Sequence, residues 1–230
     1  QKVTRIHGWY PVFGDATDLE VSGRCFDAAR TNHHKNRVLR WQTVSLGPVF
    51  LKQRLTPGNV DEGHSMPALL SSTRDLVREA LGSKAPILAL LDGAYFERPV
   101  IEPLRAWTNF IVGANQQRDC LERLAKERFP DVWFETGPDA VRGWRRSQVC
   151  CFTHQPAGWT QPVTIVARRW ENENELQGMW RYSFVATNIE ERDLPKKLLR
   201  RHGYCEAIWL LYGTKQGHEN HYKTALCDFG

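Results

Sequence analysis

A short run of apolar residues near the middle of the chain constrains the fold most. Residues 86–91 read Pro-Ile-Leu-Ala-Leu-Leu without a polar interruption, and Asp92 and Gly93 close the run. A strand that lacks polar alternation is typical of the interior of a sheet that is covered on both faces. We therefore predict a buried strand over residues 86–91, with Asp92 at its carboxyl end.

The segments around this run predict a mixed sheet. Upstream of this run, apolar and polar residues alternate loosely, which indicates an antiparallel meander. The meander ends at the Thr-Pro-Gly-Asn turn at residues 56–59. Apolar residues at helical spacing follow, and Gly82 marks the end of the helix that they predict. The order is that of an α/β, RNase H-like fold, a mixed five-stranded sheet flanked by helices. We predict strand, strand, strand, helix, strand, helix and strand over residues 9–21, 37–44, 48–55, 66–81, 86–91, 96–107 and 109–113.

The second half of the chain predicts an insertion into this core. Beyond a helix at residues 119–129, the sequence is rich in Trp, Gly and Pro, and a helical period returns only after Asp193. We divide the chain into residues 1–114 and 191–230, which form the core, and residues 115–190, a β-rich insertion. The strands predicted in the insertion and the helices that follow it cover residues 147–153, 163–170 and 180–187, and then 195–201 and 206–225.

Composition narrows the class of protein. With 230 residues, 41% of them hydrophobic, the chain can bury a substantial core, and its net charge of +5 suits a polyanionic partner without requiring one. No apolar stretch approaches a membrane span, and residues 1–20 lack the layout of a signal peptide. The six cysteines lack CxxC spacing, so we expect reduced thiols in a soluble intracellular protein. Its polar start and abrupt end suggest a segment of a longer protein.

Three acidic residues are candidates for a metal site. Two carboxylates on strand ends and a third on a helix, here Asp15, Asp92 and Glu219, are what two-metal phosphoryl transfer needs, because Mg²⁺ and Mn²⁺ prefer oxygen ligands. Each has an alternative. Asp92 could be a helix N-cap or a turn residue. Asp18 would face the opposite side of the strand that holds Asp15, and the pattern favours Asp15 only slightly.

Three motifs resemble those of a known enzyme family. Residues 13–23, Phe-Gly-Asp-Ala-Thr-Asp-Leu-Glu-Val-Ser-Gly, resemble the first-aspartate strand of DDE transposases of the bacterial insertion-sequence superfamily. Residues 90–96, Leu-Leu-Asp-Gly-Ala-Tyr-Phe, are similar to the second-aspartate motif. Residues 212–223 resemble the third motif, in which a tyrosine and a basic residue precede the glutamate. The motifs occur in order, and the resemblance spans nearly the whole chain.

The resemblance implies a function. It implies that Asp15, Asp92 and Glu219 hold two Mg²⁺ (or Mn²⁺) ions per active site. It also implies that the enzyme uses these ions to cleave DNA at transposon ends and to join the new 3′-hydroxyl to target DNA. Double-stranded DNA and a second copy of the chain, as a homodimer in a synaptic complex, would be the partners in the bacterial cytoplasm, without a membrane. The family's β-rich insertion would account for the 127 positions between Asp92 and Glu219 (219 − 92).

The resemblance and the local composition also suggest DNA contacts. Lys215 stands where the family usually has arginine, and Leu226 stands where a lysine is expected. Lys215, Glu219 and Lys223 share one helix face, which could instead be a surface salt-bridge ladder. Tryptophans in a small β module are usually core, and we expect Trp159 to be the most exposed. The predicted DNA-binding residues are Tyr212, Lys215, Lys223, Asn59, Trp159, Arg168, Arg169, Arg200 and Arg201.

Two other functions are open at this point. A nuclease with an RNase H-like fold would keep the metals and end at hydrolysis. A DNA-binding protein derived from a transposase would keep the fold and lose catalysis, although all three candidate acids are present here.

Overall fold

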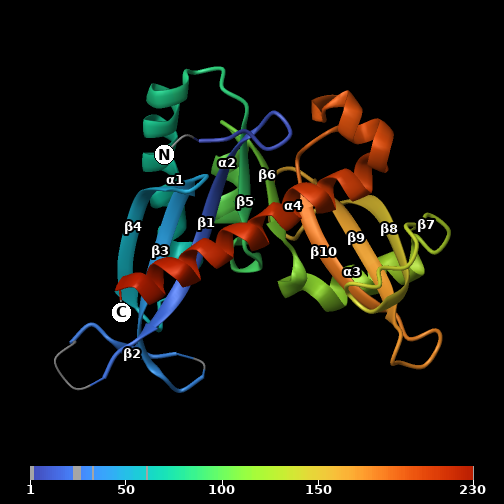
Figure 1. Cartoon of the computed structure of the whole chain (residues 1–230), viewed down its shortest axis with the longest axis horizontal. Helices are drawn as coiled ribbons and strands as arrows, with labels where there is room; N and C mark the ends of the chain where they lie inside the picture. Colours follow the sequence, from blue (N-terminus) through green and yellow to red (C-terminus); the bar gives the residue numbers. More distant parts are fainter. Residues whose placement is uncertain (1–2, 23–26, 33, 61, 230) are drawn as a thin grey trace.

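The computed structural model describes residues 3–22, 27–32, 34–60 and 62–229, apart from the side chains at 62, 64 and 218–229. Within these ranges the chain forms one mixed sheet of ten strands with helices on both faces (Figure 1). The strands are β1 (Tyr10–Glu20), β2 (Arg30–Thr31), β3 (Arg37–Leu46), β4 (Val49–Pro57), β5 (Ile87–Leu91), β6 (Asn109–Gly113), β7 (Phe134–Glu135), β8 (Trp144–His154), β9 (Val163–Asn172) and β10 (Arg181–Thr187). The α-helices are α1 (Glu62–Leu81), α2 (Arg98–Arg105), α3 (Arg118–Glu127) and α4 (Lys196–Phe229), and the short 3₁₀ helices are η1 (Gly93–Tyr95), η2 (Asn115–Gln117) and η3 (Glu191–Asp193).

The centre of the sheet has the predicted mixture of directions. Strands β1, β3 and β4 form an antiparallel meander, and β5 and β6 run parallel to β1. The resulting order β4-β3-β1-β5-β6 is compatible with an RNase H-like fold. All five residues of β5 are buried, as the unbroken apolar run predicts.

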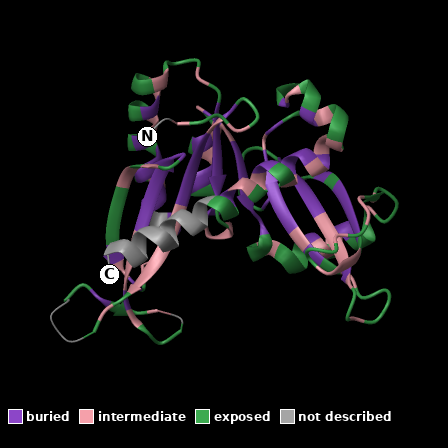
Figure 2. Cartoon of the chain, in the orientation of Figure 1, coloured by how far each residue is buried: buried purple, intermediate pink, exposed green. Residues whose placement is uncertain are grey.

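Two hydrophobic clusters cover the two faces of the sheet. On β1, Val12 packs in the cluster beneath α1, α2 and α3, whereas Phe13 packs in the cluster beneath α4. On β5, Leu91 belongs to the first cluster and Leu90 to the second. Because side chains alternate along a strand, this parity fixes the face on which each neighbouring residue lies. Figure 2 shows the buried central strands between more exposed helices.

The predicted count of five strands is wrong for the described part of the chain. Strand β10 pairs antiparallel with β6, through Val185 and Gly113 among others, and β9, β8 and β7 follow in the same sheet. Strands of the predicted insertion therefore extend the central sheet. The frequent Trp, Gly and Pro residues indicate these strands correctly, but local sequence does not reveal that the free edge of β6 is their partner.

Helix α4 crosses the face of the sheet that the other α-helices leave open (Figure 1). The sequence predicts two helices here, and the structure joins them at Gly203, whose φ of 68° and ψ of 173° interrupt the helical path. Glycine adopts a positive φ at little steric cost. Among the described residues, no helix combines the length and apolar character that a membrane span requires.

Candidate active site

Two of the three candidate acids lie next to each other at one end of the sheet. Strands β1 and β5 are parallel, and Gly14 pairs with Leu91. Asp15 and Asp92 are the next residues on these two neighbouring strands, which in a sheet run about 4.8 Å apart. The fit before Asp15 is close, because a Cβ at Gly14 would lie 2.6 Å from Leu91 Cδ2, which would have to shift.

Both aspartates lie on the face that α4 covers. Phe13 and Leu90 pack beneath α4, and Asp15 and Asp92 each follow one of them by two residues. The backbone of Asp92 is extended, with φ −72° and ψ 163°, so the alternation continues past the end of β5. The β1–β5 register and the alternation of side chains together place the two carboxylates near each other on the α4 face of the sheet.

Each aspartate also has contacts within the chain. Asp15 Oδ1 accepts a hydrogen bond from the backbone N–H of Ala16 at 2.9 Å and lies 3.8 Å from Lys215 Nζ. Lys215 is buried, with 4% of its surface exposed. Asp92 is exposed and accepts from the N–H of Gly93 at 2.7 Å as the N-cap of η1. The capping alternative for Asp92 is thus real, and it leaves the second carboxylate oxygen available.

Tyr212 lies at the same end of the sheet. Its hydroxyl lies 3.4 Å from the carbonyl oxygen of Leu91, directly before Asp92. A Cβ at Gly113, the last residue of β6, would lie 2.9 Å from the Tyr212 hydroxyl oxygen and 3.0 Å from the Gly93 nitrogen. Glycine at position 113 therefore allows α4, η1 and β6 to meet beside the two aspartates.

Glu219 and Lys223 lie in α4, four and eight residues after Lys215. Four residues of α-helix rise about 6 Å, so each step is close to one turn. The side chains of both residues are outside the described residues, and so is the predicted contact of Glu219 with the aspartates.

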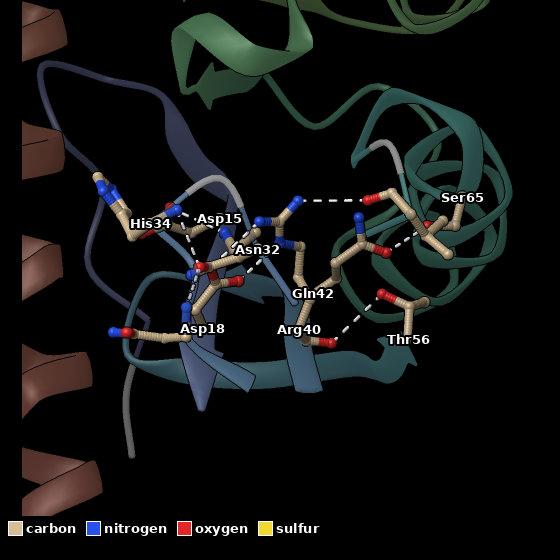
Figure 3. A network of polar contacts seen from close by, with 11 residues as sticks. Asp15, Asp18, Asn32, His34, Arg40, Gln42, Thr56 and Ser65 are labelled. Carbon is tan, nitrogen blue, oxygen red and sulfur yellow. Dashed lines mark hydrogen bonds and ion pairs between the residues drawn. The ribbon is translucent and has the colours of Figure 1, made fainter. Parts of the chain in front are cut away.

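Asp18, the alternative to Asp15, is engaged elsewhere. Arg40 donates from Nε to Asp18 Oδ1 at 2.8 Å and from Nη2 to Oδ2 at 3.2 Å, and Asn32 donates to Oδ2 at 2.8 Å (Figure 3). A two-pronged arginine pair of this kind fixes both partners. Asp18 therefore joins β1 to β3 and to the segment after β2.

The expectation that Trp159 is the most exposed tryptophan is wrong. Trp159 is 7% exposed, and its ring lies 5.1 Å from that of Phe96 in the cluster beneath α1, α2 and α3. It is thus core and lies on the face away from Asp15. The flanking Gly158 and Thr160 suggest an exposed loop, but tertiary packing buries the ring between them.

The other predicted DNA-binding residues are dispersed. Asn59 is exposed after β4, and Pro57 pairs with Leu39, which pairs with Leu19 of β1. Leu19 lies four residues beyond Asp15 on β1, so Pro57 is about 13 Å from Asp15 along the strand direction. Arg200 and Arg201 are exposed on α4 before Gly203.

The two insertion arginines lie on opposite faces of β9. Arg169 stacks on Trp133 at 4.2 Å and on Trp180 at 4.6 Å, and its Nε donates to Gln148 at 2.6 Å. These contacts make Arg169 part of the packing on the face away from α4. Arg168 faces α4, 5.0 Å from the ring of Trp209.

Arg168 lines a cavity of about 760 Å³ between residues 136–144 and α4. Burial lowers the pKa of Arg168 to about 10, and Glu206 lies 4.0 Å away. Three buried polar atoms in this wall, Arg168 Nε, Ser147 Oγ and Trp209 Nε1, have no hydrogen-bond partner among the described residues.

The helical wall of this cavity was not among the predicted site residues. Glu206, Trp209, Leu210, Gly213 and Thr214 line it from α4. Their spacing of three, four, seven and eight residues from Glu206 is that of one helix face, which could have identified them. Ser147 gives no comparable signal in the sequence.

The oxygen chemistry of the site fits a divalent cation. Two neighbouring carboxylates on one face are hard anionic ligands, which Mg²⁺ and Mn²⁺ prefer. Within the described side chains, no group of three or more His, Cys, Asp or Glu residues could hold a metal. The further ligand that the sequence predicts is Glu219, whose side chain is outside the described residues.

Comparison with known proteins gives distant structural similarities alone. No protein-family profile matches the sequence, and no curated protein matches it. A solved piggyBac transposase, in a synaptic complex with hairpin DNA, is similar with a TM-score of 0.42 and 10% sequence identity. The similarity covers 89% of this chain and 40% of that one, so this chain spans about two fifths of the transposase. A similarity at this level establishes neither a family nor a function.

Proposed function

We propose that this chain is the catalytic domain of a DDE transposase. The observation that supports this most directly is the pairing of parallel β1 and β5, which makes Asp15 and Asp92 neighbours on the face beneath α4. In this proposal residues 1–114 and 191–230 form an RNase H-like core, and residues 115–190 are an insertion that extends its sheet.

Glu219 is proposed as the third acid. The ammonium of Lys215 lies 3.8 Å from Asp15, so α4 already meets β1 at this turn. Glu219 follows by about one helical turn, within the distance that a glutamate side chain can span. The same spacing makes Lys215 and Lys223 its neighbours along the helix.

The proposed cofactors are two Mg²⁺ or Mn²⁺ ions held by Asp15, Asp92 and Glu219. Bound there, they would activate water or a 3′-hydroxyl and stabilise the leaving oxygen of the phosphodiester. The protein itself contributes by fixing the positions of the metal-binding carboxylates. The β1–β5 register sets the separation of the two aspartates, and the cap on Gly93 orients Asp92.

Lys215 and Tyr212 have proposed roles in holding the DNA backbone. Lys215 Nζ lies 3.8 Å from Asp15 Oδ1, and in this proposal its charge balances the carboxylate before a cation or phosphate arrives. The Tyr212 hydroxyl donates to the Leu91 carbonyl oxygen at 3.4 Å, a long hydrogen bond that it would exchange for a phosphate oxygen next to Asp92.

The cavity beside α4 is the proposed contact with the DNA end. Arg168 Nε and Trp209 Nε1 are donors without partners among the described residues, and the rings of Trp144 and Trp209 offer stacking surfaces. Thr214 lines the same cavity and directly precedes Lys215, so a strand held there would reach the acidic residues. Double-stranded DNA, a homodimeric synaptic complex and a location with DNA in the bacterial cytoplasm belong to this proposal.

Metal binding and DNA chemistry test the proposal together. We expect Mn²⁺ to bind the wild-type chain, as measured by electron paramagnetic resonance, and the Asp15→Asn and Glu219→Gln variants to lose that binding. Asp75→Asn is the matched control, because Asp75 is exposed on α1 and pairs only locally with Arg74. Retention of wild-type Mn²⁺ affinity in both site variants would reject the proposed site.

A strand-transfer assay separates the proposal from the two alternatives. With a precleaved 3′-hydroxyl end and a plasmid target, a transposase joins the two in Mg²⁺, whereas a nuclease only nicks the plasmid. Metal-dependent nicking without joined product would favour the nuclease. DNA binding with neither product would favour a transposase-derived binding protein.

A further inference from the structure

Two cysteines meet where β8 packs against α4. Val149 of β8 and Cys205 of α4 belong to the same buried cluster, and Cys151 follows Val149 by two residues. Alternation along the strand places Cys151 on the α4 face. Val166, which pairs with Cys151 across β8 and β9, also packs in that cluster.

The two thiols lie at the same contact between β8 and α4 and differ in access to solvent. Cys151 is exposed, whereas Cys205 is buried with 8% of its surface exposed, and both are free thiols. Two cysteines can close a disulfide where their Cα atoms come within about 7 Å of each other. Cys151 is therefore accessible to a small oxidant in solution, whereas Cys205 is shielded from it.

The contact also divides the two thiols chemically. The hydrogen bond from Cys205 lowers the pKa of Cys151 to about 7. The same hydrogen bond and burial raise the pKa of Cys205 above its usual range. Because a thiolate is the nucleophilic form of cysteine, Cys151 is the reactive member of the pair near neutral pH.

We propose that Cys151 and Cys205 form a peroxide-reactive dithiol that closes to an intramolecular disulfide. The Cys151 thiolate attacks one oxygen of hydrogen peroxide, the O–O bond breaks, and the released hydroxide takes a proton to become water. Cys205 sulfur then attacks the sulfur of the Cys151 sulfenic acid. The S–S bond forms, and the hydroxyl leaves with the Cys205 proton as a second water. The two thiols are oxidised and one peroxide is reduced.

The disulfide would tie the extended sheet to α4. It would join residues 54 positions apart (205 − 151), between β8 and the helix that continues to Tyr212 and Lys215. Closing a loop of this length restricts the unfolded chain. We therefore expect the oxidised protein to melt several degrees higher than the reduced one. This inference does not depend on the proposed DNA chemistry.

Peptide mapping of the oxidised chain tests the inference. The reduced protein is treated with stoichiometric hydrogen peroxide, alkylated, digested and analysed by mass spectrometry, without DNA or metal. We expect a cross-linked peptide that contains Cys151 and Cys205, and loss of two alkylatable thiols from six. Reduction with dithiothreitol should restore both thiols and the lower melting temperature.

Variants separate the two steps. In Cys205→Ala, the sulfenic acid on Cys151 has no partner thiol and should be trapped by dimedone. Cys120→Ser is the matched control, because Cys120 is an exposed cysteine on α3, and this variant should still form the cross-link. A wild-type map without the Cys151–Cys205 peptide, or dimedone labelling of Cys120 as fast as Cys151, would overturn the inference.

Discussion

Asp15 and Asp18 lie three residues apart on β1, and their neighbours give them different roles. Arg40 and Asn32 occupy both oxygens of Asp18, so its charge is compensated inside the fold. Asp15 instead lies beside Asp92 on the α4 face, with Lys215 as its cationic neighbour. Two neighbouring carboxylates repel each other, and a shared divalent cation would relieve this repulsion.

Replacement of Asp92 by asparagine separates metal binding from helix capping. Asparagine keeps an acceptor oxygen for the N–H of Gly93, so we expect unfolding free energy to change by less than about 0.5 kcal/mol. It removes the anionic ligand, so DNA cleavage should fall by at least about 100-fold, since even outer-shell changes cost 10–100-fold. Urea denaturation and a plasmid-nicking assay measure the two effects. Unchanged nicking in Asp92→Asn would exclude Asp92 from the site.

The alkylation rate of Cys151 should depend on pH with a midpoint of about 7. Because the thiolate is the form that reacts with iodoacetamide, the rate should rise as pH increases through this midpoint and fall below it. Cys205→Ala removes the hydrogen bond that stabilises the thiolate, so the midpoint should move upward. Site-resolved mass spectrometry measures the rate at each pH. A midpoint that stays at its wild-type value in Cys205→Ala would contradict this account of the contact.

At the scale of elements, α4 contributes most to the candidate site. It brings Tyr212 to the end of β5 and Lys215 to Asp15. The face of α4 that is turned to the sheet packs on Phe13 and Leu90. The position of the helix therefore depends on hydrophobic packing, on small residues at its crossing points, and on the break at Gly203.

Two glycine substitutions should have opposite effects on stability. A Cβ at Gly113 would lie 2.9 Å from the Tyr212 hydroxyl and 3.0 Å from the Gly93 nitrogen, so Gly113→Ala should destabilise the fold by about 1–3 kcal/mol. Gly213 is exposed in α4 and has nothing within 4 Å of its Cβ position, so Gly213→Ala should stabilise by about 0.5–1 kcal/mol. Urea denaturation compares the two variants. Equal effects would show that the crossing at Gly113 is looser than the structure indicates.

Local pattern predicted most of these elements. The strand at Asn109–Gly113 has the predicted bounds, and β5 differs from its prediction only at Pro86. These predictions succeed because burial on both faces leaves an unbroken apolar run. Helix α1 begins at Glu62, four residues before its prediction, because its first turn is polar and lacks an apolar period.

Long-range pairing was the part that local pattern could not predict. The antiparallel partner of β6 is β10, some 70 residues later, and nothing within either strand specifies the other. The environment of Trp159 likewise depends on Phe96 from a distant segment. The register that joins Asp15 to Asp92 depends on such pairing, so the sequence supplied the candidates and not their proximity.

At the scale of the whole molecule, the described sheet is continuous from β4 to β7. The cluster beneath α1, α2 and α3 includes Val12 of β1, Phe110 of β6 and Ile165 of β9. The buried surface thus passes from the proposed core into the proposed insertion without an exposed boundary. A chain built in this way should unfold as one unit.

We expect Ile165→Ala to shift the whole unfolding transition. Ile165 is fully buried in β9, and removal of its side chain should cost about 2–5 kcal/mol. Far-ultraviolet circular dichroism and tryptophan fluorescence should report the same lowered midpoint, because tryptophans lie in both halves of the sheet, for example Trp41 and Trp144. Val141→Ala, at a side chain that is 98% exposed, is the control. A second transition at the wild-type midpoint would show instead that the insertion unfolds independently.

The distribution of charge over the molecule, rather than its net value, should determine how DNA binds. The net charge of +5 is too small to identify a DNA-binding face, but Arg200 and Arg201 are exposed together on α4. If they contact phosphates, Arg200→Ala should reduce the slope of log affinity against log salt by about 1, since each lost phosphate contact retains its counterion. Lys84→Ala removes the same charge from the turn between α1 and β5 and should leave the slope unchanged. Fluorescence anisotropy with a labelled duplex measures both slopes. Equal slopes for the two variants would mean that the affinity follows net charge, and Arg200 would then be no part of the DNA-binding surface.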